Sequence, residues 1–300
     1  MSAIDTVRSE FDGLPGMFGS YLRTLLSRKP TLSHPDRPLT RIEVAGRRVS
    51  MPENRLEAYL AVCGSSGTEL AVPPLYPQVF AMPLHLKILT SNAFPVRPLG
   101  VVHLRNVVRQ TGPDPLQEPL DFETALSSKR DVDAGQEYDI DSRCSVAGQA
   151  VWEAKTTFLV RRPAHEVKGR PPRPPSVKGT TPDFEPVPVD VPEDIGRRYA
   201  RCSGDYNPIH WNARTAGWFG FRKAIAHGMW SLAATLVAAK RDVYTQPVEI
   251  EARFSAPIYL PSMLSVVQLA DSDRTVGEER YLLRDAQKPR VHLEVDVRSL

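Results

Sequence analysis

Apolar and polar positions alternate through two long stretches of the chain, residues 119–162 and 248–300. The first contains "EYDIDSRCSV" and "AVWEAKTTFLVRR", with turn signals at "DVDAG" and "VAG". An alternation with a period of two places every second side chain on the same face of a strand. Each stretch is therefore predicted to form an antiparallel meander.

A more continuously apolar segment precedes each meander, "AMPLHLKILTSNAF" at 81–94 and "HGMWSLAATLVAAKRDV" at 227–243. The second segment is apolar nearly all round, which is typical of a buried helix. A buried helix wrapped by an antiparallel sheet, present twice, predicts an α+β fold.

The first 26 residues contain apolar side chains at roughly helical spacing, interrupted by two glycines and a proline. They predict a leading helix that acts as a docking element rather than a membrane anchor. Charged residues divide the apolar ones, so this stretch does not have the pattern of a signal peptide. The apolar positions are Phe11, Leu14, Phe18, Leu22 and Leu25.

Residues 163–192 are rich in proline, which lacks the backbone donor that a helix or a central strand needs. We interpret this run as an extended connector, in preference to a PxxP ligand for a partner domain. It divides the chain into an N-terminal domain, 1–162, and a C-terminal domain, 193–300.

A segment of the N-terminal domain resembles a segment at the start of the C-terminal domain. "PENRLEAYLAVCGS" at 52–65 aligns with "PEDIGRRYARCSGD" at 192–205, with proline, glutamate, tyrosine and glycine in the same order. With a shift of five residues, the two apolar helical segments also align. These matches indicate a duplicated domain.

Composition excludes several classes of protein. The chain has 300 residues, of which 41% are hydrophobic and 24% charged, with a net charge of +3, so nothing favours nucleic-acid binding. No window approaches 18 apolar residues, so no membrane span is expected. The cysteines Cys63, Cys144 and Cys202 have no metal-ligand spacing, and their odd number argues against a disulfide framework. We expect a cytoplasmic protein.

The stretch "YARCSGDYNPIH" at 199–210 places Asp205 and His210 on either side of a short turn, with Asn207 between them. A carboxylate and an imidazole held together can bind one water and move protons in either direction. A polar turn that caps the next element is an equally good explanation of this motif taken alone.

A second feature favours the catalytic interpretation. Gly228 lies at the expected start of the buried helix, where a backbone N–H can donate to a developing oxyanion. His227 precedes it, and we interpret this histidine as a structural one, because the glycine N–H already supplies the electrophile.

Together, "YARCSGDYNPIH" and "AHGM" resemble the hydratase 2 motif of the MaoC-like, hotdog-fold enoyl-thioester hydratases and 3-hydroxyacyl-thioester dehydratases. The glycine follows the aspartate by 23 positions, and most of the chain resembles the actinobacterial double-hotdog members. The resemblance implies two hotdogs that form an intrachain pseudo-dimer.

The resemblance also implies a hydro-lyase of fatty-acid metabolism that interconverts trans-2-enoyl and (R)-3-hydroxyacyl thioesters of coenzyme A or acyl carrier protein. Asp205 and His210 would share the acid and base roles, Gly228 would form the oxyanion hole, and Asn207 would support the loop. No metal or other cofactor is needed. Two alternatives remain, a hotdog thioesterase and a non-enzymatic acyl-binding protein. Both a monomer and a homodimer fit the sequence.

The first repeat lacks the same chemistry. Ser65 aligns with Asp205, Leu70 with His210, and Pro83 with Gly228. Proline has no backbone N–H to donate. We therefore expect the N-terminal hotdog to be non-catalytic.

Overall fold

The computed structural model describes residues 5–65, 73–98, 100–112, 119–162, 185–239, 247–269 and 277–300. These residues form two compact units. The first draws on residues 1–51, 80–106 and 112–172, and the second on 52–79, 107–111 and 173–300. Residues 52–79 thus belong to the second unit although they lie in the first half of the chain.

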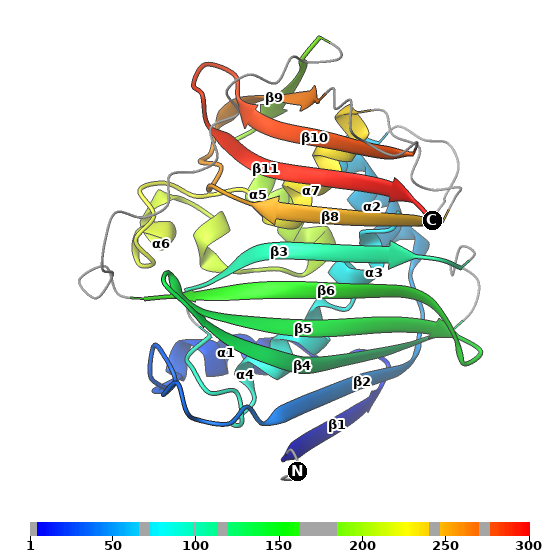
Figure 1. Cartoon of the computed structure of the whole chain (residues 1–300), viewed down its shortest axis with the longest axis vertical. Helices are drawn as coiled ribbons and strands as arrows, with labels where there is room; N and C mark the ends of the chain where they lie inside the picture. Colours follow the sequence, from blue (N-terminus) through cyan, green and yellow to red (C-terminus); the bar gives the residue numbers. More distant parts are fainter. Residues whose placement is uncertain are drawn as a thin grey trace. The chain divides into compact units, whose positions relative to one another are not determined.

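The first unit is a mainly antiparallel sheet with a central helix, as the alternating pattern predicted, and only its first pair of strands is parallel (Figure 1). Its strands follow the order β1-β2-β4-β5-β6-β3, and helix α4 (Met82–Thr90) packs on β2 and β4. The apolar faces of the strands form the core, with Phe122, Ile140 and Trp152 almost fully buried. The strands are β1 (Thr6–Asp12), β2 (Arg41–Val49), β3 (Val101–Gln110), β4 (Leu120–Val132), β5 (Gly135–Val146) and β6 (Gln149–Arg161).

The second unit repeats this plan. Helix α7 (Gly228–Ala238) packs on strands of a sheet whose order is β8-β11-β10-β9-β7, and residues 107–110 at the end of β3 belong to this unit. Its remaining elements are β7 (Val187–Val191), β8 (Val248–Phe254), β9 (Ser262–Gln268), β10 (Glu278–Asp285), β11 (Val291–Ser299), α2 (Glu53–Cys63), α3 (Tyr76–Phe80), α5 (Ile195–Ser203), the 3₁₀ helix η2 (Pro208–His210) and α6 (Ala213–Gly217).

Both meanders and both apolar helices are therefore confirmed, and each unit is a hotdog. Helix α7 is buried along most of its length, as its continuously apolar sequence predicted. No helix within the described residues is long and apolar enough to cross a membrane.

The predicted leading helix is wrong over its first half. Residues 6–12 form strand β1, which pairs with β2 in parallel, and helix α1 covers only Phe18–Leu26. Gly13 adopts a left-handed conformation with φ 73° between the two elements. Helical spacing of apolar residues could not reveal that β2 offers this segment backbone partners.

The predicted connector is shorter than 163–192. Residues 187–191 form strand β7, which pairs with β9 at the end of the sheet of the second unit. An edge strand tolerates Pro188, because its missing donor can face away from the partner strand. Residues 163–184 lie outside the described part of the chain.

Candidate active site

Asp205 owes its position to the end of helix α5. Gly204 terminates the helix in a left-handed conformation, φ 78°, and its N–H donates to the Ala200 carbonyl. Glycine adopts this conformation without the steric cost that a Cβ would add. The turn leaves the Asp205 side chain 30% exposed, while its Oδ1 accepts a hydrogen bond of 3.2 Å from the Asn207 N–H.

Asn207 organises the next turn. Its side-chain oxygen accepts a hydrogen bond of 3.3 Å from the Ile209 N–H and so caps η2, the short helix that ends at His210. This is the local hydrogen bonding for which asparagine is favoured at helix starts. Asp205 and Asn207 together fix the chain between the carboxylate and the imidazole.

His210 is buried and held in one tautomer. Its Nδ1–H donates to the Ile225 carbonyl at 2.7 Å, which leaves Nε2 as the acceptor of the neutral ring. Burial, and secondarily the charge of His227, lower the pKa of His210 to about 3 against the opposing effect of Asp205. The imidazole is therefore neutral near pH 7, with an unprotonated Nε2.

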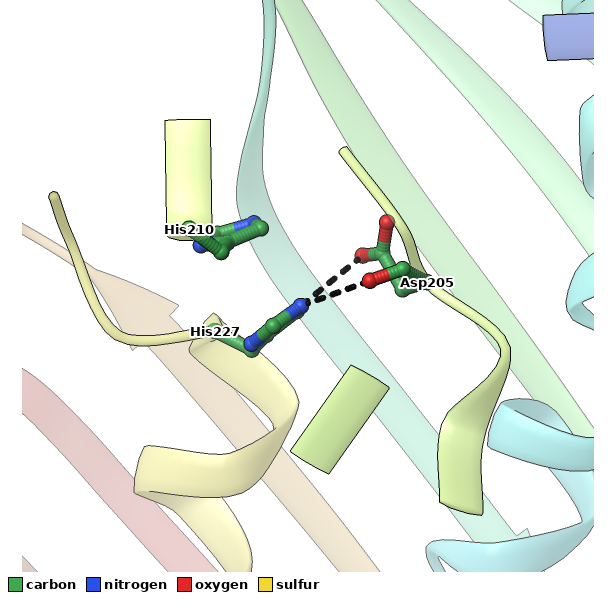
Figure 2. A group of neighbouring side chains, drawn as sticks. All are labelled: Asp205, His210 and His227. Carbon is green, nitrogen blue, oxygen red and sulfur yellow. Dashed lines mark hydrogen bonds and ion pairs between the residues drawn. The ribbon is translucent and has the colours of Figure 1, made fainter. Parts of the chain in front are cut away.

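His227 lies next to His210 and directs its ring toward Asp205 (Figure 2). Its ring stacks on that of His210, with centroids 3.5 Å apart and planes inclined by 23°. Its Nε2–H donates to the Asp205 backbone carbonyl at 3.0 Å and lies 3.8 Å from Asp205 Oδ2. Burial lowers the pKa of His227 to about 4, so this ring is also neutral near pH 7.

Sequence reasoning set His227 aside as a structural histidine, but the structure brings it into contact with both Asp205 and His210. The available signal was its place directly before Gly228. The residue before a helix start lies next to the free N–H groups of the first turn, so its side chain was a candidate neighbour of a site built there.

Gly228 is the first residue of α7, and His227 before it is extended. The first N–H groups of a helix have no partner within the helix, and they point toward its positive end. A Cβ on Gly228 would lie 3.1 Å from the Phe254 ring, so glycine also suits the close packing here.

Gly196 is another glycine of the site, and the sequence alone did not point to it. A Cβ at this position of α5 would lie 2.0 Å from the His210 backbone carbonyl oxygen. Such a contact is impossible without movement of the backbone, so any larger residue would displace either α5 or η2. The absence of a side chain at Gly196 therefore sets where His210 lies.

Asp205, His210 and His227 each offer one potential metal-ligand atom, and these atoms lie within 4.8 Å of one another. Two of the four ring nitrogens are already engaged with carbonyl groups, Nδ1 of His210 and Nε2 of His227. What the cluster offers for chemistry is a partly exposed carboxylate beside the free Nε2 of a neutral imidazole. A pair of this kind suits proton transfer to and from water.

The aligned positions of the first repeat differ. Ser65 follows Gly64, which ends α2 with φ 85° just as Gly204 ends α5. Pro83 lies in the first turn of α4, where it contributes no N–H. Leu70 lies outside the described residues. The backbone features recur, whereas the carboxylate and the N–H donor do not.

A carboxylate–imidazole pair beside the start of a buried hotdog helix is the arrangement expected of a hydro-lyase site. The family model described as "MaoC like domain" matches residues 174–283. A relative from Mycobacterium tuberculosis, 3-hydroxyacyl-thioester dehydratase X, is 30% identical over 287 residues, which cover 95% of this chain and 99% of the relative. The chain therefore belongs to the MaoC-like dehydratase family.

Solved structures show the same fold. The crystal structure of HtdX from Mycobacterium tuberculosis has a TM-score of 0.71 at 28% identity, covering 86% of this chain and 100% of that one. A MaoC-like dehydratase from Phytophthora capsici has a TM-score of 0.70 at 21% identity, covering 87% of this chain and 96% of that one. A double-hotdog protein from Mycobacterium tuberculosis, at 13% identity and a TM-score of 0.51, shares the fold over 84% of this chain and 93% of its own.

Proposed function

We propose that this protein is a hydro-lyase that interconverts trans-2-enoyl thioesters and (R)-3-hydroxyacyl thioesters. The main observation behind the proposal is that the Asp205 carboxylate lies close to the His210 imidazole. One potential ligand atom of each side chain lies within 4.8 Å of the other. His210 is buried and neutral, so its Nε2 is an acceptor for a water proton, and Asp205 is partly open to an incoming water.

In the hydration direction, the pair holds a water whose oxygen adds to the β-carbon of the enoyl thioester. One proton of that water passes to the pair, and the pair delivers a proton to the α-carbon, so one water is added in total. Because the two groups are coupled, the acid and base roles are assigned to the pair rather than to either residue.

During this addition, negative charge develops on the thioester oxygen. Gly228 N–H at the positive end of α7 is our proposed donor to that oxygen, because a fixed dipole stabilises charge without reorganisation. Asn207 supports the turn through its cap of η2. The chemistry needs neither a metal nor a redox group, since the thioester itself makes the α-carbon acidic.

We assign His227 a positioning role. Its N–H fixes the Asp205 backbone, and its ring covers one face of His210, so it holds the two members of the pair relative to each other. A displacement of about 1 Å in such a pair is sufficient to lower turnover about a hundredfold.

Hydration of crotonyl-CoA, followed as loss of the enoyl-thioester absorbance, tests the proposal. Asp205→Asn and His210→Gln are each expected to lower kcat by about 10²- to 10⁴-fold, the usual contribution of an acid–base group. His292→Gln is the matched control, because His292 is a buried histidine of the same unit that lies on β11.

Turnover that persists in the Asp205→Asn/His210→Gln double variant would disprove the assigned pair. Release of free thiol, measured with a thiol reagent, would instead support a thioesterase. Binding of enoyl thioesters of every chain length without turnover would support an acyl-binding protein.

A further inference from the structure

The segment that follows the catalytic motif, residues 211–223, is positively charged and exposed. It carries Arg214, Arg222 and Lys223 on its surface, and the chain from Tyr206 to Lys223 contains no aspartate or glutamate. The whole protein has nearly balanced charges, with a net charge of only +3. We call residues 211–223 the cationic segment.

The cationic segment is anchored beside the catalytic pair. The Thr215 hydroxyl donates to the Pro208 carbonyl at 2.7 Å, within η2. Just beyond the segment, the Ile225 N–H donates to the Ile209 carbonyl at 3.1 Å, and the Ile225 carbonyl accepts from His210. Hydrogen bonds therefore tie this part of the chain, both within the segment and just after it, to the 3₁₀ helix that carries His210.

The charged side chains of the cationic segment differ from arginines on the sheets, which are paired with carboxylates. Arg130 pairs with Asp139 and Arg298 pairs with Glu249. Within the described ranges, no carboxylate forms an ion pair with Arg214, Arg222 or Lys223. Uncompensated arginines and lysines beside a site attract anionic ligands, and arginine in particular binds phosphate.

Aromatic side chains accompany these charges. The Arg222 guanidinium lies over the Tyr259 ring, 4.6 Å from its centroid, which limits the freedom of the arginine. Trp218, one residue beyond α6, is 72% exposed. An exposed tryptophan offers a flat face on which a nucleotide base can stack.

We propose that the cationic segment binds the nucleotide end of coenzyme A, with its cations on the phosphates and Trp218 on the adenine ring. This inference rests on the proposed function, because the acyl thioester of the same molecule would occupy the catalytic site. An acyl carrier protein presents a phosphate and acidic side chains but no purine. The exposed tryptophan therefore favours the nucleotide.

The test compares two substrates that share the reacting thioester, crotonyl-CoA and crotonyl-pantetheine. Trp218→Ala and the Arg222→Ala/Lys223→Ala double variant should each raise KM for crotonyl-CoA about five- to tenfold and leave kcat unchanged, since loss of base stacking has an effect of this order. KM for crotonyl-pantetheine should not change. Arg280→Ala, which removes an arginine already paired with Asp296, is the matched control.

Direct binding provides a readout that does not depend on turnover. Adenosine 3′,5′-bisphosphate should bind the wild-type protein in calorimetry, more weakly at high salt, and several-fold more weakly to Trp218→Ala. Equal rises in KM for both substrates would overturn the proposal, because the variants would then act on the catalytic pair. Crotonyl-acyl carrier protein is assayed as a third substrate. A rise in KM that is confined to this substrate would overturn the proposal in favour of a protein carrier.

The two proposals fail in different ways. If the wild-type protein binds the bisphosphate but hydrates neither thioester, the proposed function is wrong and the nucleotide site stands. If it hydrates crotonyl-pantetheine and crotonyl-CoA with the same KM, the function stands and the nucleotide site is wrong.

Discussion

Helices α2 and α5 end in the same way but lead to different chemistry. Each terminates at a left-handed glycine, Gly64 with φ 85° and Gly204 with φ 78°. The next residue is Ser65 in one case and Asp205 in the other. The shared glycine preserves the turn, whereas the ionisable group depends on a single side chain that the backbone does not require.

The two central helices extend this comparison. Helix α4 has Pro83 in its first turn, and its buried His85 hydrogen-bonds to the Ser142 hydroxyl at 2.8 Å. Helix α7 begins at Gly228, preceded by a histidine that contacts Asp205 and His210. The fold thus tolerates a buried histidine in either unit, and among the described residues only the second unit places one against both a carboxylate and a second imidazole.

Among the changes that exchange features of the two helices, the largest effect is expected from giving α7 the proline that α4 carries. Gly228→Pro should lower kcat for crotonyl-CoA by about 10²- to 10³-fold, because it removes the proposed oxyanion donor. The helix should persist, since proline is favoured at the first helical position and the extended His227 is compatible with it.

Gly228→Ala is the control for Gly228→Pro. It adds a Cβ near the Phe254 ring but keeps the N–H, so it should retain most of the activity. Equal losses in both variants would show that packing, and not the N–H, matters at this position. Circular dichroism of each variant establishes that the fold is intact.

A smaller effect is expected for His227. His227→Phe keeps an aromatic ring on His210 but removes the hydrogen bond to the Asp205 carbonyl, and kcat should fall about 10- to 100-fold. His227→Asn keeps a donor and loses the ring, so partial recovery relative to phenylalanine is the expected result. If kcat is unchanged in both variants, His227 is a structural histidine, as the sequence suggested.

The smallest effect concerns acid stability and should not distinguish the two units. Burial lowers the pKa of His85 to about 4, and His210 and His227 are lowered to about 3 and about 4. Below pH 6.5 these histidines become protonated in the unfolded chain but stay neutral in the folded one. The free energy of unfolding therefore decreases as the pH falls toward 4.

Urea unfolding at pH 7 and pH 5 measures this loss, which is at most about 2 kcal/mol for each buried histidine. His85→Asn should reduce the difference between the two pH values, and so should a substitution of His227. His34, which is exposed, serves as the control, and His34→Asn should leave the difference unchanged. If only the substitution of His227 reduces the difference between the two pH values, the acid sensitivity arises in the second unit alone.

Much of this architecture could be predicted from the chain alone. Alternation and apolar runs predicted both meanders and both central helices, because these patterns report which face of an element is buried. The first half of the leading helix and the full length of the connector were wrong. Strands β1 and β7 exist because a neighbouring strand supplies their hydrogen bonds, and no local pattern encodes that neighbour.

The sequence by itself determined the fold class, the family resemblance and the catalytic candidates, since Asp205, Asn207 and His210 belong to one short turn whose conformation is local. Tertiary structure alone decided the contacts that His227 and Gly196 make with the site. The first stacks on His210 from the start of α7, and the second leaves room for the His210 backbone against α5. Both depend on how separate elements pack, because contact between distant residues is set by the shared core and not by spacing along the chain.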